Sequence, residues 1–285
     1  MEKINCPICE TKNFKNYILV KDRFDKNDIH EFNIVKCNCS LVYLNPRPTE
    51  KKMSKYYSIT NYDPHKIKEN NLKDIIYNLV QQIALRFKLF IINLHHKSGN
   101  LLDIGGGKGE FVEFMSLKGY NTVLQDNYSK YNGNIDFYNN LHNIKTNFDI
   151  ITMWHVLEHI HKLDELFNFF KNKLNENGIL VLAVPNHNAV ERKYFKESWA
   201  PYDAPRHLYH FDLYTLEKLL NKYNFKIVTK NVLLHDSFYN ILLSFKSLDF
   251  IKIIKFIIIG IDCLLKTIIY GTKKSSSIMV VCKKY

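Results

Sequence analysis

Residues 101–109 read Leu-Leu-Asp-Ile-Gly-Gly-Gly-Lys-Gly, and this stretch decides the fold of the chain. Two apolar residues and an acid lead into a loop whose glycines permit positive φ and keep side chains away from a ligand. Glu110 then opens an amphipathic segment. The pattern predicts a strand, a tight turn and a helix start, with a nucleotide-type ligand at the carboxyl end of a parallel strand.

The spacing of the glycines separates the candidate ligands. Counting from Gly105 and Gly107, the third glycine of a dinucleotide fingerprint would fall at Glu110, and the Ser or Thr of a phosphate-binding loop would fall at Gly109. Both phosphate-binding motifs are therefore excluded. The remaining pattern, Asp-x-Gly-x-Gly-x-Gly from Asp103, resembles the class I S-adenosylmethionine-dependent methyltransferases. The resemblance implies that Asp103, Gly105, Gly107 and Gly109 bind the cofactor, with the loop against its amino acid part.

The residues after the glycine loop agree with this resemblance. A helix is expected to end at Lys118-Gly119, and a second strand over residues 121–124 leads to Asp126. The family uses an acid at this place to accept hydrogen bonds from the ribose hydroxyls, so Asp126 is the predicted ribose ligand. The alternative is an acid in a surface turn. A short third strand over residues 135–138 would end near the adenine, with Asp136 as a weak candidate there.

A fourth strand is expected over residues 148–154, which are mostly apolar and typical of a strand buried on both faces. It would deliver His155-Val156-Leu157-Glu158-His159 into the crevice. The segment Trp-His-Val-Leu-Glu-His looks similar to that of the branch that includes ubiquinone-pathway and glycan methyltransferases. This resemblance assigns Trp154 to the cofactor site.

Methyl transfer mainly requires an aligned acceptor and removal of its proton. Histidine suits a base near neutral pH, so His155 is the first catalytic candidate, and the alternative is a residue that only shapes the pocket. For Glu158 and His159, a structural role in orienting the loop is favoured. His207 is the second catalytic candidate, in a segment rich in aromatic and cationic residues (Trp199, Tyr202, Arg206, Tyr209 and His210) that suits a phosphorylated sugar. The alternative is a packed lid.

The rest of the chain completes an α/β fold. We expect a helix from residue 163 to 177 and strands over 179–184, 225–232 and 277–283, giving a seven-stranded Rossmann-like sheet with helices on both faces over residues 99–285. A helical insertion falls at about 236–275. Its part 251–271 is rich in Ile and Leu, but four charges on one stripe argue against a membrane span. Peripheral membrane contact, a cover over the pocket or a homodimer contact are the alternatives.

Four of the six cysteines lie in the first forty residues, as Cys6-Pro-Ile-Cys9 and Cys37-Asn-Cys39. Two turns that each present two thiolates can close a structural zinc site, so residues 1–50 are predicted to form a small zinc-ribbon-like module. Because the second pair is Cys-x-Cys, His30 is an alternative ligand. Residues 51–98 would form a connecting helical segment. Glycan methyltransferases carry a similar amino-terminal arrangement.

Composition limits the partners. The formal net charge is +12, but its lysines are scattered along the chain without a compact basic block, which does not favour nucleic acid. The amino terminus lacks the apolar core of a signal peptide, so a cytoplasmic protein is expected, with a peripheral position at the inner face of the membrane as a second reading.

Together, the residues and the resemblance predict an S-adenosylmethionine-dependent methyltransferase. The resemblance implies that its acceptor is a sugar of a surface glycan or of its nucleotide- or lipid-linked precursor. One alternative is O-methylation of a quinone-like or lipid phenol. The other is a non-catalytic module that uses the zinc ribbon for binding.

Overall fold

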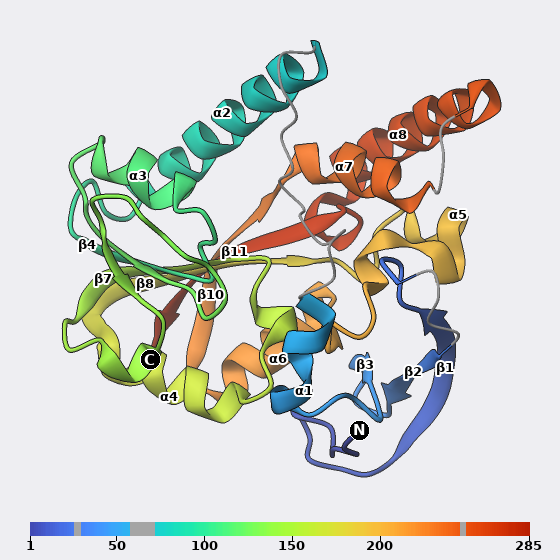
Figure 1. The fold of residues 1–285 in the computed structure, drawn as a ribbon, viewed down its shortest axis with the longest axis horizontal. Coiled ribbons are helices and arrows are strands. Elements are labelled where there is room, and N and C mark those ends of the chain that lie inside the picture. Colours follow the sequence, from blue (N-terminus) through green and yellow to red (C-terminus); the bar gives the residue numbers. More distant parts are fainter. Residues whose placement is uncertain (26–29, 58–71, 246–248) are drawn as a thin grey trace.

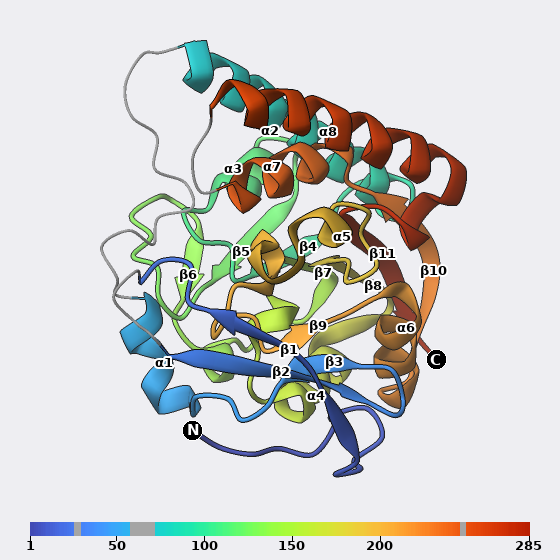
Figure 2. The same cartoon turned by 90° about the vertical axis from the view of Figure 1, so that its right-hand side faces the viewer.

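The structure is a computed structural model that describes residues 1–25, 30–57, 72–245 and 249–285. Its larger sheet, drawn in Figures 1 and 2, has the strand order β10-β11-β8-β7-β4-β5-β6, which can be followed in Figure 2. These strands are β4 (Asn100–Ile104), β5 (Asn121–Gln125), β6 (Asp136–Tyr138), β7 (Phe148–Trp154), β8 (Leu174–Pro185), β10 (Phe225–Val232) and β11 (Ser277–Lys284). The predicted seven-stranded Rossmann-like sheet is therefore confirmed.

The strand order creates a crevice at the centre of the sheet. Strands β6, β5, β4, β7 and β8 run parallel, while β11 is antiparallel to both β8 and β10. The chain starts this sheet at β4, continues to β5 and β6 on one side and then returns to β7 and β8 on the other. At such a switch point the connections leave toward opposite faces, so a ligand crevice opens beyond the carboxyl ends of β4 and β7.

Helices cover both faces of the sheet because the buried strands alternate their side chains (Figure 1). Leu101 and Ile150 pack in the core with α2 (Leu72–Asn93) and α3 (Glu110–Ser116). Their neighbours Leu102 and Ile151 pack in the other core, with α4 (Leu163–Lys173) and α6 (Leu213–Lys222). The apolar strands of the single sheet thus contribute side chains to two cores, one on each face.

The boundary between α4 and β8 differs from the prediction. The helix ends at Lys173 and β8 begins at Leu174, several residues before the expected break at Asn177-Gly178. Leu174 is buried, adopts an extended backbone and pairs with Phe148 of β7. Leu174 fits the apolar spacing of the helix, but pairing with β7 places it in the strand.

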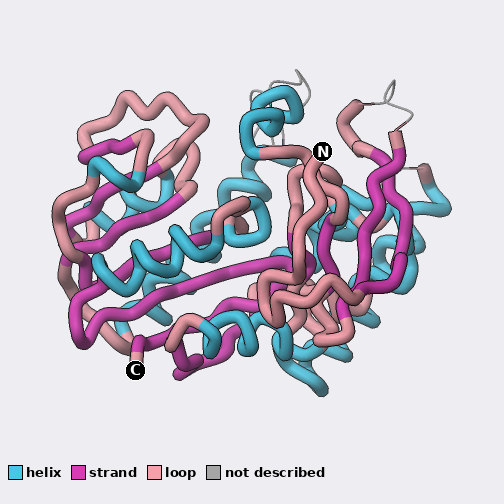
Figure 3. Tube along the Cα trace, turned by 90° about the horizontal axis from the view of Figure 1, so that it is seen from below, coloured by secondary structure: helices cyan, strands magenta, loops and turns pink. Residues whose placement is uncertain are grey.

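A smaller sheet has the order β1-β2-β3-β9 and lies to one side of the large one (Figures 2 and 3). Its strands are β1 (Phe14–Lys21), β2 (Glu31–Cys37), β3 (Val42–Leu44) and β9 (Tyr209–His210). Strands β1 and β2 form an antiparallel hairpin near the amino terminus. The last strand, β9, comes from the loop region after β8, so residues 1–50 share a sheet with the rest of the chain.

Further helices flank the two sheets. They are α1 (Glu50–Tyr57), α5 (Arg192–Phe195), α7 (Leu234–Ser244) and α8 (Phe250–Tyr270). Helices α7 and α8 lie between β10 and β11 in the chain and on the same side of the large sheet as α2 and α3 (Figure 1). Among the described helices, none combines the length and apolar character needed to cross a bilayer.

Candidate active site

The glycine loop forms one wall of the crevice. Gly105 has a φ of 69°, and a Cβ there would approach Cγ2 of Val156 to 2.5 Å. Gly107 has a φ of 58°, and no atom of the described residues lies within 4 Å of its Cβ position. Positive φ is strained for other residues. The loop therefore packs closely below Gly105 and presents a bare backbone to open space at Gly107.

Asp103 lies beneath this loop and is almost fully buried. Its Oδ1 accepts a hydrogen bond from the hydroxyl of Thr152, while its Oδ2 has no hydrogen-bond partner within the part of the chain that the structure describes. Burial raises the pKa of Asp103 to about 7, against the opposing effect of the Thr152 hydrogen bond. Asp103 thus supports the loop with one buried polar atom unsatisfied.

Asp126 joins the end of β5 to the glycine loop. Its Oδ2 accepts a hydrogen bond from the backbone N–H of Gly107 at 3.0 Å. Its Oδ1 accepts from the N–H groups of Tyr128 and Ser129 at 2.8 and 2.7 Å. A carboxylate has about four acceptor positions, so Oδ2 retains one for a further donor such as a ribose hydroxyl.

The crevice holds a cavity of about 1040 Å³, lined by Gly105, Asp126, His155 and His159 among other residues. Helix α1 contributes Tyr57, which stacks on Tyr128 with ring centroids 4.8 Å apart. The volume is large enough for a nucleoside cofactor and an acceptor together. The bare loop, the carboxylate and this space fit S-adenosylmethionine.

His155 follows β7 with a φ of 56° and faces the cavity. Its Nε2 lies 3.0 Å from Oδ2 of Asp236, and its Nδ1 lies 3.7 Å from Oε1 of Glu158. Burial alone would lower the pKa of His155, but the negative charge and hydrogen bond of Asp236, with Glu158, raise it to about 10. In this arrangement the ring carries a proton at neutral pH, so a base role would require the pair with Asp236 to open.

Sequence reasoning missed Asp236, because it belongs to α7 and lies 81 positions from His155. Burial would raise its pKa, but the charge of His155 lowers it to about 2. Tyr57 was missed as well. No motif marks either residue, although Asp236 falls at the start of the expected helical insertion and Tyr57 falls in the expected connecting segment.

Trp154 and His207 lie beside the cavity rather than in its lining. The Trp154 ring packs edge-on against Phe111 at 5.2 Å, with Nζ of Lys88 4.1 Å from its centroid. His207 donates from Nδ1 to the carbonyl of Pro201 at 2.8 Å. A direct role of Trp154 at the cofactor and of His207 in catalysis remains a prediction.

The aromatic and cationic segment around His207 forms packing between the two sheets. Trp199, Tyr202 and Tyr209 are each about 2% exposed. Arg206 is fully buried and pairs with Asp22, close to β1, and with Asp203. The expectation that Arg206 faces a phosphorylated acceptor is therefore wrong, because two carboxylates already surround its guanidinium.

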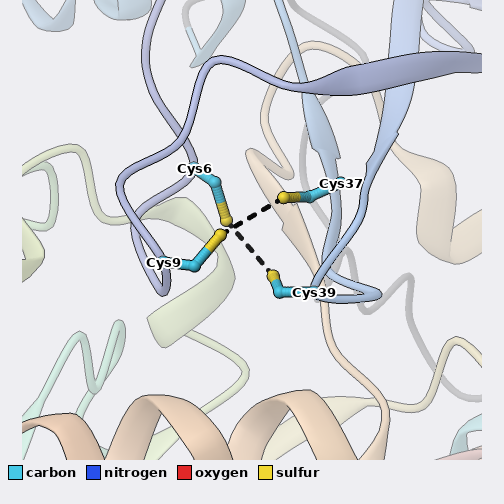
Figure 4. A group of neighbouring side chains, drawn as sticks. All are labelled: Cys6, Cys9, Cys37 and Cys39. Carbon is cyan, nitrogen blue, oxygen red and sulfur yellow. Dashed lines mark hydrogen bonds between the residues drawn. The ribbon is translucent and has the colours of Figure 1, made fainter.

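The four amino-terminal cysteines converge (Figure 4). The sulfur atoms of Cys6 and Cys39 are 3.5 Å apart, and those of Cys9 and Cys37 are 3.4 Å apart. All four lie within 4.8 Å of one another, so the Cys-x-Cys pair reaches the same point as Cys-x-x-Cys. His30 instead packs on Phe32, with ring centroids 4.8 Å apart. Four sulfur ligands at this spacing suit tetrahedral zinc.

The fold and crevice define a nucleoside-cofactor enzyme of the Rossmann-like class, and comparisons with known proteins identify its family. A methyltransferase domain model matches residues 72–230, so the chain belongs to this methyltransferase family. With its sheet order, it is a class I S-adenosylmethionine-dependent methyltransferase and an enzyme. Among curated proteins, no significant match is found.

Solved structures of low sequence identity resemble the chain. A methyltransferase from Archaeoglobus fulgidus is 16% identical with a TM-score of 0.49, over 75% of this chain and 100% of that one. A cyclopropane synthase from Mycobacterium tuberculosis, MmaA2, is 14% identical with a TM-score of 0.47, over 77% and 87%. An N-methyltransferase from Burkholderia thailandensis, solved with 1,6-didemethyltoxoflavin and S-adenosylhomocysteine, is 12% identical with a TM-score of 0.46, over 77% and 92%.

Proposed function

We propose that the enzyme transfers a methyl group from S-adenosylmethionine to a sugar of a surface glycan or of its nucleotide- or lipid-linked precursor. The lining of the cavity supports this acceptor. Beyond the cofactor loop, amides and cations gather on its wall: Asn139, Asn140, Asn168, Asn172, Lys145, Lys162 and Lys173. Amides both donate and accept hydrogen bonds, as neighbouring sugar hydroxyls require, and lysines suit a phosphate or diphosphate.

An aromatic acceptor is the second candidate. The stacked rings of Tyr57 and Tyr128, together with Phe169, line the same cavity and suit a quinone-like or lipid phenol. Incubation with methyl-labelled cofactor and panels of nucleotide sugars, polyprenyl-linked glycans, quinone precursors and RNA separates the candidates. We expect label in a sugar, whereas label only in phenols or only in RNA would contradict the proposed acceptor.

The proposed site roles follow the crevice. Asp103, Gly105, Gly107 and Gly109 would hold the amino acid part of the cofactor, and Asp126 its ribose. The cofactor supplies an activated methyl group when bound. His155 is proposed to contact the acceptor, since it faces the cavity at the end of β7. His155→Gln should lower kcat while leaving the Kd of the cofactor unchanged, and an unchanged kcat would contradict this role.

We also propose structural zinc at the cysteines of residues 1–50, held by Cys6, Cys9, Cys37 and Cys39. Elemental analysis of purified protein should find this ion in the wild type and one zinc fewer per chain in Cys6→Ser. Cys263→Ala is the matched control, because Cys263 is buried far along the chain in α8. Equal zinc in all three proteins would contradict the proposal. Loss of zinc binding together with retained methyl transfer would exclude a purely binding module.

Peripheral contact with an anionic membrane is proposed for residues 251–271. Helix α8 exposes a broad apolar surface formed by Phe250, Ile251, Ile253, Ile254, Ile257, Ile258, Ile261, Leu265, Ile268 and Ile269. The net charge of +12 would add attraction to acidic lipids. The wild type should co-sediment with phosphatidylglycerol vesicles and Ile257→Glu/Ile258→Glu should not. Dimers by analytical ultracentrifugation without vesicle binding would instead support a homodimer contact.

A further inference from the structure

A buried carboxylate next to the crevice has no hydrogen-bond donor in the described part of the chain. Glu158 follows β7 and is fully buried, and neither of its carboxylate oxygens has a hydrogen-bond partner among the described residues. Nδ1 of His155, at 3.7 Å from Oε1, is too distant for a hydrogen bond. An ionised carboxylate in such a place requires hydrogen-bond donors as well as a compensating positive charge, and the charged ring of His155 supplies only the charge.

Two histidines beside Glu158 present nitrogen lone pairs. Nδ1 of His159 lies 3.1 Å from the carbonyl oxygen of Arg206, and Nδ1 of His207 lies 2.8 Å from that of Pro201. A carbonyl only accepts, so a hydrogen bond to it requires that each Nδ1 carries the hydrogen and that each Nε2 has a lone pair in the neutral ring. In this tautomer the hydroxyl of Tyr57, 3.0 Å from Nδ1 of His159, also acts as an acceptor. Histidines that bind metals are commonly fixed in this way, with the second ring nitrogen bonded to a carbonyl or carboxylate.

We propose that Glu158, His159 and His207 form a second metal site, for a divalent first-row transition ion. One ligand atom from each of the three lies within 4.8 Å of the others, and the two rings meet edge to face with centroids 4.6 Å apart. Ligands at about 2.1 Å from an ion are up to about 4.2 Å apart, so small side-chain rotations close the site. Two imidazoles and one carboxylate select zinc, iron, cobalt or manganese and leave coordination positions open.

The competing arrangement is an ion-pair cluster without metal. In that case His207 would be protonated, and its Nε2 lies 3.9 Å from Oδ2 of Asp203. However, Asp203 already accepts three hydrogen-bond contacts from the guanidinium of Arg206. Such a pair also leaves Glu158 without a hydrogen-bond donor from the residues that the structure describes. A metal ion satisfies the carboxylate and both ring nitrogens together.

The site has a role in methyl transfer that rests on the proposed function. His159 lines the cavity, so the open positions face the space for the acceptor. A coordinated acceptor hydroxyl has a lowered pKa and loses its proton to solvent. Its oxygen then attacks the methyl carbon, and the electrons of the breaking carbon–sulfur bond return to sulfur. The products are the methyl ether, S-adenosylhomocysteine and one proton.

Cobalt titration of the purified full chain tests the site. Cobalt held by the four cysteines gives a thiolate charge-transfer band, whereas cobalt held by nitrogen and oxygen does not, so absorbance and total bound metal count the two sites separately. We expect a second, thiolate-free cobalt in the wild type and at least tenfold weaker binding of it in Glu158→Gln and His207→Gln. His96→Gln is the control, because His96 lies at the end of α2 against Asn177. Only thiolate-bound cobalt in the wild type would overturn the proposal, as would equal binding by all variants.

Two further readouts keep this test independent of the proposed function. Circular dichroism melting establishes that each variant is folded, and the wild-type count stands without any variant. Calorimetry with S-adenosylmethionine reports on the cofactor site alone. If the protein binds the cofactor but not the second metal, only the metal-site proposal is wrong. If it binds the second metal but not the cofactor, only the proposed function is wrong.

Discussion

Replacing Asp126 by asparagine should weaken binding of S-adenosylmethionine without unfolding the enzyme. In the structure, one oxygen of Asp126 accepts from the N–H groups of Tyr128 and Ser129, and the other accepts from Gly107. Asparagine keeps one carbonyl oxygen for the first two donors. Its amide nitrogen cannot accept from Gly107 or from a ribose hydroxyl.

The expected loss follows from these contacts. A hydrogen bond to a charged group contributes about 1.5–3 kcal/mol. The bond to Gly107 is lost in both the free and the bound enzyme and therefore affects mainly folding. The ribose bond is lost only in the complex, so the Kd should rise roughly 10- to 150-fold. Isothermal calorimetry with S-adenosylmethionine and S-adenosylhomocysteine measures this change.

Asp136→Asn is the matched control. Asp136 is the first residue of β6, so it lies near the amino-terminal ends of the parallel strands, close to the starts of β4 and β5 and away from the crevice at their carboxyl ends. The prediction from the sequence that Asp136 lies near the adenine is wrong for this reason. The control should bind the cofactor as the wild type does. A Kd of folded Asp126→Asn within twofold of the wild type would refute the assignment of Asp126 to the ribose.

Three further predictions concern other parts of the chain. Arg206→Met leaves the buried carboxylate of Asp22 uncompensated and should lower the free energy of unfolding in urea by about 3–5 kcal/mol, while Lys162→Met, at an exposed ion pair, should lower it by less than about 1 kcal/mol. Similar losses in both variants would contradict this difference. Burial lowers the pKa of His187 to about 3, so between pH 6.5 and 3 the unfolded chain binds a proton that the folded chain does not. The free energy of unfolding should therefore decrease by about 1.4 kcal/mol for each unit by which the pH is lowered in this range, and His187→Phe should remove this part of the pH dependence. Urea titrations at several pH values that give the same pH dependence for His187→Phe and the wild type would contradict this prediction. Gly107→Ala adds a methyl group at a φ of 58° that projects into open space, so it should cost about 1–2 kcal/mol of folding stability and also weaken cofactor binding by calorimetry. Loss of stability alone would argue that the cofactor does not touch this position.

Local sequence patterns were sufficient for the large sheet and for the glycine loop at the carboxyl end of β4. The run from Leu101 to Gly109 predicts a strand and a tight turn because apolar residues and glycines act within a few positions of each other. The position of the Asp126 carboxylate beside the glycine loop could be predicted because Asp126 directly follows the next strand. The cysteine cluster could be predicted in the same way, since two closely spaced cysteines belong to one turn.

The segment 199–210 shows where this reasoning reached its limit. Its aromatic and cationic residues fit both an acceptor pocket and a packed lid, and composition does not say which face a side chain takes. The structure buries Trp199 and Arg206 between two sheets, one of which takes its last strand from this segment. Part of the crevice wall comes instead from asparagines and lysines that carry no motif.

The sequence by itself determined the class of fold, the glycine loop and the cysteine cluster, because each depends on residues near one another in the chain. Only the tertiary structure paired His155 with Asp236, enclosed Arg206 with Asp22 and brought His207 to Glu158 and His159. These partners lie about 50 to 180 positions apart. Their meeting depends on how the sheets and helices pack around shared cores, which burial of apolar surface drives without leaving a local pattern.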